Sequence, residues 1–452
     1  MKKMKKLGNI RFVDTAAGTY GISMSGTNDY GIENLLRGIA GAWDTDPLFY
    51  GSAKVVPYGP DNNLPANIRN LLEKNNLGPG ILDRKTGLQY GSGPFLYRLK
   101  FENNEILKEW TEDAEVQAWL NSWNYREFAR NALHEFNYMR GFFARYYLAK
   151  GSRIGYLPRI TRIECEHSND CRLEWPADNS RRLEEVANIF VGDFESLSSR
   201  ELKKYPVFDE THPGRYPVSM KYHSYRSFAR YFYAVSSFFG SIPWVRRAND
   251  IPDIIRYLTD NMIAAAYHIH EPEEYWNRKE NLIRDMNPEW DDTRVQESVN
   301  KSREELTRTI ANILSGKRNA GKFFESIDFV DENGNKCEWK IEPIEMNIDK
   351  YIEAQAQISR IADSSTTSGF GLNPALSNII IDGKGDSGSQ MLYALKIFYA
   401  ADAQIAEDIV FEPVNTALRI NFPGKHLSMG FYRHTVNKED NVPADKRTAN
   451  NI

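Results

Sequence analysis

Apolar residues recur at helical spacing on both sides of a glycine-rich stretch in the last quarter of the chain. The first set is Tyr351, Ala354, Ile358 and Ile361. Their steps of three, four and three place them on one face of a helix over 348–365. The second set is Met391, Leu395, Phe398, Ile405 and Ile409. It predicts a long helix within 389–430.

The stretch between these two helices, over 366–388, is predicted to be a loop. It contains five glycines and one proline among several Ser, Thr and Asn residues, a composition that opposes a regular helix. Loops of this length inside a compact fold are usually functional or disordered. The apolar residues of this loop favour an ordered, functional loop. They are Phe370, Leu372, Leu376, Ile379, Ile380 and Ile381.

Upstream, the pattern predicts a compact α+β domain over 31–243. A helix is expected over 65–74, and a long amphipathic helix over 125–150. Alternating residues over 153–175 predict strands, and the charged residues over 180–187 predict another helix. The aromatic stripe of the long amphipathic helix is best explained as core.

A further helix is predicted over 244–267. Asn249 offers a capping side chain, and Pro252 suits the first turn of a helix. Apolar residues then follow at helical spacing through Met262. These signals predict that the regular helix begins at Asn249.

The segment 268–347 is predicted to hold a polar connection, a charged helix over 293–314 and a β-hairpin. Asn333 and Gly334 lie between two runs of alternating residues. Because Asn-Gly readily adopts the positive φ angles of a type I′ turn, this pair indicates the turn of the hairpin.

Composition places the chain among globular proteins. Of its 452 residues, 41% are hydrophobic and 26% charged, and the 12% aromatic content favours large interfaces. The formal net charge of -4 excludes a uniformly basic nucleic-acid coat, so contacts with DNA are expected to be local. Residues 1–30 predict a flexible arm, and 431–452 predict a solvated, flexible tail.

The chain has three cysteines, Cys165, Cys171 and Cys337, and they lack CxxC spacing. This pattern favours a reducing compartment over a disulfide scaffold. No apolar run follows the basic start of the chain, which argues against a secretory signal, and no stretch is apolar enough to cross a bilayer. We therefore expect a cytoplasmic protein with no membrane contact.

Two short motifs resemble catalytic sequences but lack the required context. Gly385–Ser389 resembles the sequence around the nucleophile of chymotrypsin-like proteases, with Ser387 as the candidate nucleophile. That fold is all-β, whereas the segments flanking this motif are predicted to be helical. Gly383–Gly385 lacks the hydroxyl residue that follows the lysine of a phosphate-binding loop. We predict no enzyme activity, no catalytic residues and no cofactor.

Metal binding is not predicted either. Cys165, His167 and Cys171 could supply ligands, but a structural zinc site needs four and usually a closer cysteine pair. A polar strand turn explains these residues better. His268 and His270 are better explained as the solvated end of a helix.

Four cations are candidates for contact with DNA phosphates. Lys317, Arg318 and Lys322 lie in a glycine-bounded turn, and Lys384 lies in the predicted loop. Such a turn can touch phosphate without reading base sequence. Taken alone, the first three cations are better explained as residues that complement the dipole at a helix C-terminus.

The order of elements over 244–430 resembles that of the tailed-bacteriophage portal family. The order is a helix, a charged helix with a hairpin, a second helix, a long loop and a long helix. The matching residues around the loop are Ile361–Asp363, Phe370–Pro374 and Gly383–Ser389. Two features depart from the family pattern: the glycine and the proline of the loop are farther apart, and little sequence follows the last helix for a large crown.

This resemblance implies an elongated portal-like subunit with an α+β, mainly helical fold. The implied parts are an arm (1–30), a wing (31–243), a first stem helix (244–267), a clip (268–347), a second stem helix (348–365), a tunnel loop (366–388), a long helix with the wing or crown remainder (389–430) and a tail (431–452). Within the tunnel loop, the apolar residues and Lys384 would pack or move at the constriction.

The resemblance also implies a set of partners. The subunit would form a homo-oligomeric ring, a dodecamer, at one capsid vertex of a virion assembled in the host cytoplasm. Double-stranded DNA would pass through the ring non-specifically. The terminase large subunit, the major capsid protein and head-completion or adaptor proteins would bind it. Net acidity with isolated cations suits a channel, because each neutralised phosphate would add affinity that slows the DNA.

Two other interpretations stay open at this point. The chain could be another phage structural protein, such as an adaptor or a minor capsid protein. It could also be an enzyme whose glycine-rich loop closes over an active site near Asp382, Asp386 and Ser387.

Overall fold

The structure of the protein is a computed structural model, and it describes most of the chain as two compact units. The described residues are 5–7, 10–15, 18–23, 43–102, 105–149, 159–195, 202–262, 267–314, 329–330, 336–337, 339–343, 348–377 and 388–434. Unit 1 combines 1–246 with 363–452, and unit 2 comprises 247–362. The fold is α+β and mainly helical, which confirms the predicted fold class.

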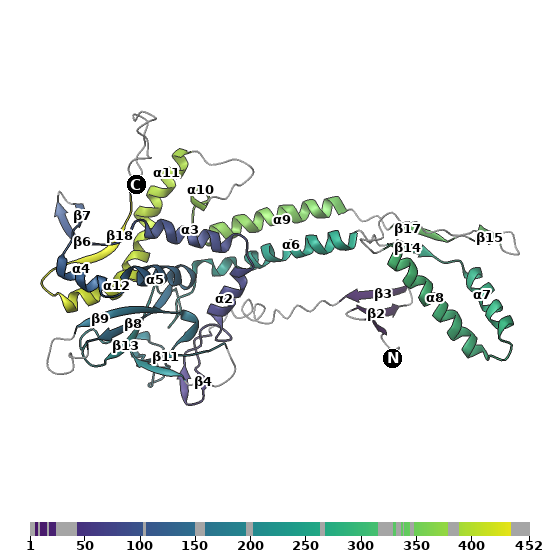
Figure 1. Cartoon of the computed structure of the whole chain (residues 1–452), viewed down its shortest axis with the longest axis horizontal. Helices are drawn as coiled ribbons and strands as arrows, with labels where there is room; N and C mark the ends of the chain where they lie inside the picture. Colours follow the sequence, from purple (N-terminus) through teal and green to yellow (C-terminus); the bar gives the residue numbers. More distant parts are fainter. Residues whose placement is uncertain are drawn as a thin grey trace. The chain divides into compact units, whose positions relative to one another are not determined.

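Unit 1 contains most of the strands (Figure 1). Its strands are β1 (Lys5–Leu7), β2 (Ile10–Thr15), β3 (Gly18–Ser23), β4 (Leu48–Tyr50), β5 (Ala53–Val55), β6 (Gly93–Glu102), β7 (Glu105–Trp110), β8 (Gly141–Leu148), β9 (Ile160–Glu166), β10 (Cys171–Leu173), β11 (Asn188–Val191), β12 (Lys203–Pro206), β13 (Val218–Ser224) and β18 (Ser428–Tyr432). Its helices are α2 (Leu64–Glu73), α3 (Gly78–Tyr90), α4 (Ala114–Asn121), α5 (Tyr125–Met139), α10 (Pro374–Ser377), α11 (Gly388–Ile397) and α12 (Ala403–Asn421). Its short turns are η2 (Ser168–Asp170), η3 (Leu183–Glu185), η4 (Ser237–Ser241) and the π-helical turn η6 (Phe398–Asp402).

An antiparallel sheet in the order β13-β8-β9 divides the core of unit 1. Phe142 and Phe143 are neighbours on β8, so their side chains point to opposite faces, and both are fully buried. Each belongs to a different hydrophobic cluster. The cluster of Phe142 includes residues of α5 and α12, which contact the sheet and lie beside it in Figure 1. The cluster of Phe143 includes residues of α2, α3 and the segment after α9.

A second sheet, in the order β18-β6-β7, contains strands from both of the sequence segments that form unit 1. β18 pairs antiparallel with β6, and Gly430 lies opposite Phe95. Glu407 on α12 packs closely against this sheet, since a Cβ atom at Gly430 would lie 2.4 Å from its Oε1 and would displace it. The C-terminal part of the chain therefore completes the same unit as the N-terminal part.

The carboxylate of Glu407 is buried and ion-paired. Its side chain is 2% exposed, and its oxygens lie 2.5 Å from Lys108 Nζ and 2.6 Å from an Arg433 guanidinium nitrogen. The three residues come from α12, β7 and the segment after β18. Because a buried charge is tolerated only with partners, this group fixes three parts of unit 1 together.

A second buried polar group ties α12 to the sheet. His223 on β13 is fully buried, and its Nδ1 lies 2.9 Å from a Glu412 oxygen on α12. Its Nε2 lies 2.9 Å from the Tyr146 hydroxyl on β8. Lys221 donates a 3.1 Å hydrogen bond to the other oxygen of Glu412. The hydrogen bonds are consistent with a neutral His223 that donates from Nδ1 and accepts at Nε2.

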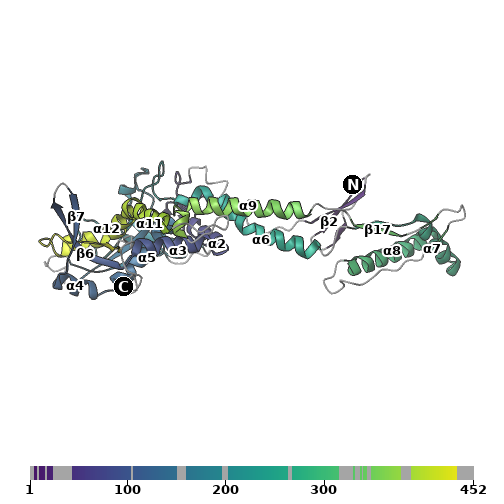
Figure 2. The same cartoon turned by 90° about the horizontal axis from the view of Figure 1, so that it is seen from above.

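Unit 2 is mainly helical. Its elements are α6 (Ile242–Met262), β14 (Tyr267–His270), α7 (Glu273–Met286), α8 (Asp292–Leu314), β15 (Phe329–Val330), β16 (Lys336–Cys337), β17 (Lys340–Pro343) and α9 (Ile348–Gly369). The chain enters unit 2 within α6 and leaves it within α9. Figure 2 shows α7 and α8 side by side, and the two helices contact each other. Arg247 on α6 donates a 3.2 Å hydrogen bond to Gln355 on α9.

Several predicted elements are confirmed. The helices predicted over 65–74 and 293–314 correspond to α2 and α8. The predicted hairpin is present, since β15 and β16 pair antiparallel, with Val330 opposite Lys336. Its Asn-Gly turn lies outside the described residues. Within the part of the chain that the structure describes, no helix has the length and apolar content to cross a membrane.

The helix predicted over 125–150 is wrong in its second half. α5 ends at Met139, Arg140 adopts a left-handed conformation (φ 56°), and β8 follows. The run after Gly141 buries side chains on both faces of a sheet, a pattern that periodicity alone cannot distinguish from a buried helix. The predicted core role of Phe128 and Phe136 is confirmed, since both are buried.

Four other boundaries also differ from the prediction. Residues 267–270 form strand β14, so His268 and His270 lie in a strand paired with β17 and not at the end of the helix predicted over 244–267. Of the helix predicted over 180–187, the structure has only η3, whose residues include no buried side chain that could anchor a helix. α6 begins at Ile242, with Pro252 in its interior, because Pro243 already occupies the first turn. The predicted polar connection after His270 contains α7, whose hydrogen-bonded pair Arg284–Glu280 has the i,i+4 spacing that supports a charged helix.

The helix predicted over 348–365 extends into the predicted loop. α9 runs to Gly369, so 366–369 is helical and not irregular. Thr366 and Thr367 are both buried, and the Thr367 hydroxyl donates to the carbonyl of Asp363 at 2.8 Å. Burial of these small residues outweighs their weak helix propensity.

Both predicted chain ends also contain strands. β1, β2 and β3 form an antiparallel sheet within the predicted arm. β18 continues to Tyr432, and Phe431 is buried, so the predicted tail begins inside a strand. The remaining residues of the tail, 435–452, lie outside the described residues.

Candidate functional site

The segment that follows α9 is anchored in the core of unit 1. Phe370 is fully buried, and its ring lies 4.6 Å from the ring of Phe238, centroid to centroid. Its carbonyl oxygen accepts a 3.0 Å hydrogen bond from Lys85 on α3. Gly371 then turns the chain with a φ of 66°, a conformation that favours glycine. These contacts fix the start of the predicted tunnel loop.

The next residues are held by a second set of contacts. Leu372 and Leu376 are buried in the same hydrophobic cluster as α3. Arg84 donates a 3.3 Å hydrogen bond from Nε to the carbonyl of Leu376. The side-chain oxygen of Asn373 accepts a 2.9 Å bond from the backbone N–H of Ala375, which starts the single turn of α10. The segment 370–376 is therefore an ordered turn bound to α3.

Lys85 is positioned to hold this turn. Burial and the nearby charge of Arg140 lower the pKa of Lys85 to about 8, although Asp402 opposes them. At neutral pH the ammonium is still mostly protonated, so it can donate to the carbonyl of Phe370.

The structure locates three of the predicted site residues. Phe370, Leu372 and Leu376 lie together in the core cluster that contains residues of α2 and α3. The other predicted site residues lie outside the described residues. They are Ile379, Ile380, Ile381 and Lys384 of the loop, and Lys317, Arg318 and Lys322 of the glycine-bounded turn. Ser387 of the protease-like motif also lies outside them.

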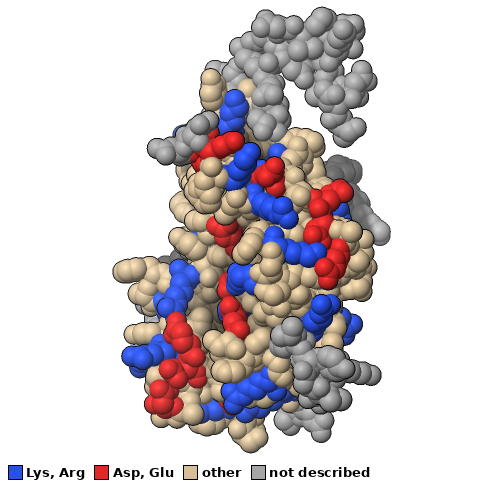
Figure 3. Space-filling view, turned by 90° about the vertical axis from the view of Figure 1, so that its left-hand side faces the viewer, with Lys and Arg blue, Asp and Glu red and all other residues tan. Residues whose placement is uncertain are grey.

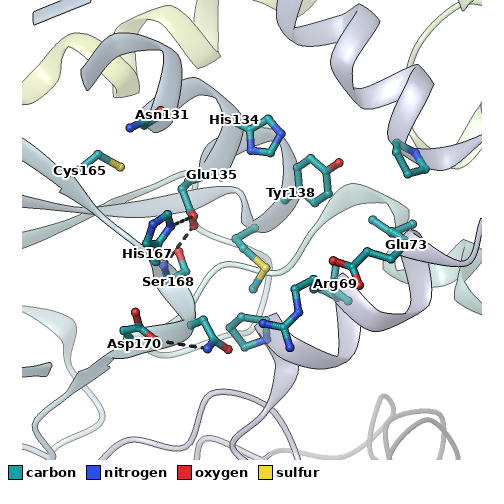
Figure 4. A pocket seen from close by; sticks show the side chains of 16 residues that line it. Arg69, Glu73, Asn131, His134, Glu135, Tyr138, Cys165, His167, Ser168 and Asp170 are labelled. Carbon is teal, nitrogen blue, oxygen red and sulfur yellow. Dashed lines mark hydrogen bonds and ion pairs between the residues drawn. The ribbon is translucent and has the colours of Figure 1, made fainter. Parts of the chain in front are cut away.

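A hollow of about 570 Å³ opens between α2, α5 and η2. Glu135 points toward His167 and Ser168 in this hollow (Figure 4). One Glu135 oxygen lies 3.4 Å from His167 Nδ1, and the other accepts a 3.2 Å bond from the backbone N–H of Ser168. The hydrogen bond to Glu135 raises the pKa of His167, although burial opposes it.

This hollow lacks the groups of a cysteine or metal enzyme. Cys165 lines it, but burial raises the pKa of the thiol well above its ordinary value. A thiol in this state is a poor nucleophile and a poor metal ligand. Within the described residues, no three His, Cys, Asp or Glu side chains form a group able to hold a metal ion.

The hairpin β6–β7 exposes an apolar face. Phe101 lies opposite Ile106, and Leu99 points to the same face two residues away. These three side chains are 73%, 66% and 52% exposed. The other face carries charged residues such as Lys100 and Glu102. Figure 3 shows charges of both signs intermixed on the side of the molecule at the left of Figure 1, with uncharged surface between them.

In unit 2, helix α7 also exposes apolar side chains. Leu282 and Met286 are 57% and 77% exposed, and they lie four residues apart on one helical face. Around them, Arg284 is ion-paired with Glu280 at 2.8 Å and with Asp292 at 2.6 Å. Apolar residues within a charged helix are typical of a surface that contacts another protein chain.

Sequence reasoning missed both the anchor residues and the exposed hairpin. Nothing in the pattern around Arg84 and Lys85 signals contact with a segment almost 300 positions away. The hairpin had a signal, because Asn103-Asn104 separates two runs in which apolar and charged residues alternate.

No protein-family model and no curated protein matches the sequence. Solved structures are similar at low identity. They include chains titled "Virion of native gene transfer agent (GTA) particle" (TM-score 0.44) and "Neck of native GTA particle computed with C12 symmetry" (TM-score 0.45). In each case the identity is 12%, and the similarity covers 91% of this chain and 91% of the other. At these values the likeness assigns no function to this chain.

Proposed function

We propose that this chain is the portal subunit of a tailed bacteriophage or a phage-like particle. In this proposal it forms a homo-oligomeric ring, a dodecamer, at one capsid vertex. The ring is the channel for DNA packaging and ejection, and it has a structural role without enzymatic activity.

The order of elements from α6 to α12 carries the proposal. α6 and α9 bracket unit 2, which contains two charged helices and the hairpin β15–β16. After α9 come an anchored turn and the long helical stretch of α11, η6 and α12. This is the order of stem helix, clip, stem helix, tunnel loop and long helix in the resemblance described above.

Two exposed apolar surfaces support self-association. One is the face of the β6–β7 hairpin that carries Leu99, Phe101 and Ile106, and the other is the face of α7 that carries Leu282 and Met286. They are distinct surfaces, which is what a head-to-tail contact between identical chains requires. Such contacts close into a ring when the rotation between neighbours allows it.

The parts of the subunit follow from this proposal. The α+β part of unit 1 acts as the wing, unit 2 holds the clip, and α6 and α9 act as stem helices. The residues between α10 and α11, 378–387, face the tunnel, whereas 366–376 anchor them in unit 1. Lys317, Arg318, Lys322 and Lys384 are transient contacts for DNA phosphates. The terminase large subunit, the major capsid protein and head-completion proteins are the proposed partners. The similar solved structures come from a virion and a neck, but at their TM-scores they add no weight.

Negative-stain microscopy of the purified full chain tests the ring. We expect rings with a central channel, and mass photometry should give a narrow distribution near twelve times 52.0 kDa. A monodisperse monomer at high concentration would contradict the proposal.

A second experiment tests whether the predicted tunnel loop is needed for DNA packaging, and the anchored turn determines which residues can be replaced. Phe370 to Leu376 belong to the core, so a deletion of the whole loop would damage folding. Replacing only 378–387 with Gly and Ser residues of equal number leaves the anchor intact. We expect this variant to form rings but to lose DNA packaging. Packaging at the wild-type level would exclude a tunnel role for these residues.

A further inference from the structure

A rigid turn in unit 1 displays a fully exposed aromatic ring. The backbone N–H of Arg230 donates to the carbonyl of Ser227 at 3.2 Å, which places Phe228 and Ala229 at the tip of a tight turn. Ala229 has a φ of 57°, and Phe228 is 100% exposed. A phenylalanine in this position contributes nothing to the core of unit 1.

The base of this turn is held by hydrogen bonds on both of its sides. The Ser227 hydroxyl accepts a 2.8 Å bond from the N–H of Val235 and donates a 3.2 Å bond to its carbonyl. The N–H of Tyr231 donates a 2.8 Å bond to Asp44, which is buried. The turn is therefore ordered before any partner binds, which lowers the entropy lost on binding.

Arginines gather beside the turn in a hollow of about 430 Å³. The residues that line it are Arg181, Arg182, Glu184, Glu185, Arg226, Arg230 and Tyr231. The lining holds four arginines and two glutamates, and the buried Asp44 lies 3.6 Å from Arg230. One net positive charge therefore remains here, although the whole chain carries -4. Such a local excess attracts anions that the rest of the chain repels.

Two of these guanidinium groups are already stacked on aromatic rings. Arg181 lies 5.4 Å from the ring centre of Tyr231, and Arg230 lies 4.7 Å from that of Trp43. Stacking holds both guanidinium planes in place. Arg230 is also ion-paired with the buried Asp44 at 3.6 Å, and Arg181 donates to the carbonyl of Thr45 at 3.5 Å. Arg226 is held by a 2.9 Å bond to Glu184, and Arg182 is exposed.

We propose that this turn and hollow bind an unpaired segment of a nucleic-acid strand. The arginines bind the backbone phosphates, because guanidinium groups match phosphate oxygens in charge and geometry. An unpaired base stacks on the ring of Phe228, whereas the faces of a base inside a duplex are already covered by neighbouring bases. The hollow has the volume of a small-molecule site, whereas protein partners usually cover broad, flat surfaces. The site does not depend on the proposed ring.

Fluorescence anisotropy with the full chain tests the site. The probes are a labelled DNA 12-mer, an RNA 12-mer of the same sequence and the corresponding DNA duplex, each at several salt concentrations. We expect both single strands to bind at least tenfold more tightly than the duplex. The two single-stranded probes distinguish DNA from RNA as the source of the segment. No binding of either single strand at low salt, or tighter binding of the duplex, would overturn the proposal.

Two variants assign the binding to the named residues. Phe228→Ala should weaken single-strand binding about 5-fold to 150-fold and leave duplex binding unchanged. Arg182→Gln/Arg226→Gln should lower the slope of log affinity against log salt by about 1.4, or about 0.7 for each lost phosphate contact. Arg130→Gln removes an exposed arginine from α5 and is the matched control, with wild-type binding expected.

Three further results would also decide whether this site binds a nucleic-acid strand. Wild-type affinity in both the Phe228 and the double arginine variants would overturn the proposal, and so would equal losses in the Arg130 control. Poly-L-glutamate that competes as well as the oligonucleotide would show that the site takes an acidic protein instead. Negative staining of the same variants separates this site from the ring, because loss of strand binding should leave rings unchanged.

Discussion

The two units differ in how much apolar surface they bury. Unit 1 holds large hydrophobic clusters on both faces of its β13-β8-β9 sheet. Among the described side chains of unit 2, few hydrophobic residues are buried, and α7 buries none. Those buried are Ile251, Val295, Val299 and Ala362. Unit 1 therefore carries its own stability, whereas unit 2 has little core in the described residues.

Because unit 2 buries few apolar side chains, we expect contacts with other chains to contribute more to its stability than to that of unit 1. Exposed ion pairs such as those of Arg284 contribute little to folding in water. A helix of 14 residues such as α7, which buries no side chain, is also marginal without tertiary packing. Unit 2 should then gain most of its order from contacts with other chains, and unit 1 should keep its structure alone.

Replacing Phe370 with alanine should produce the largest loss of stability, and the loss should fall in unit 1. The side chain is fully buried in unit 1, and a buried Phe→Ala change costs about 3–5 kcal/mol. Denaturant unfolding, combined with hydrogen exchange resolved by peptide, measures the loss in unit 1. Phe228→Ala makes the same chemical change at a fully exposed site and should stay within about 0.5 kcal/mol of wild type. Equal effects of the two variants would contradict a core role for Phe370.

Glu407→Ala should come next in size. The substitution leaves Lys108 and Arg433 without their buried counter-charge, and breaking such a pair costs about 3 kcal/mol. Thermal unfolding followed by circular dichroism measures it. Glu280→Ala in unit 2 removes a carboxylate whose partners Arg284 and Gln296 are both exposed, so its effect should be much smaller. A reversed order of the two effects would break the comparison between the units.

Acidification should weaken unit 1 through His223. Burial lowers the pKa of His223, although its hydrogen bond to Glu412 opposes this. Below about pH 6.5 the unfolded chain takes up a proton that the folded histidine resists, so stability falls as the pH drops. Burial alone would raise the pKa of Glu412, but the hydrogen bond from His223 and the charge and hydrogen bond of Lys221 lower it to about 2. Its contribution is present above about pH 4.3 and is lost as the pH falls toward 2.

The two groups therefore act in the same direction but over different pH ranges. The melting temperature measured between pH 7.5 and pH 5 should fall in the wild type. His223→Gln keeps a polar side chain but removes the titration, so its melting temperature should depend less on pH in this range. An unchanged pH dependence in the variant would assign the effect to other groups.

Sequence periodicity predicted the elements that are specified by residues close to one another in the sequence. The charged helix α8 and the hairpin β15–β16 follow from spacing and from the Asn-Gly pair alone. β8 was predicted as helix because a run buried on both sides has no distinctive period. The extension of α9 to Gly369 depends on tertiary burial of Thr366.

The candidate site was predictable only in part. The apolar residues of the loop were identified, but their partner Lys85 lies on α3, and no local pattern connects two such distant segments. The exposed turn around Phe228 could not be recognised either, because exposure of an aromatic residue is a property of the folded chain.

The smallest effect on stability is expected for the exposed face of α7. Leu282→Ser/Met286→Ser removes two side chains that are mostly in solvent, so unfolding should stay within about 0.5 kcal/mol for each change. Mass photometry should nevertheless show fewer rings, because this face is proposed to contact a neighbouring chain. Val295→Ala on α8 is the contrasting variant, since its side chain is fully buried and its loss should cost about 2 kcal/mol. If the α7 variant unfolds unit 2 as strongly as Val295→Ala does, its apolar face belongs to a core, and the contrast between the units fails.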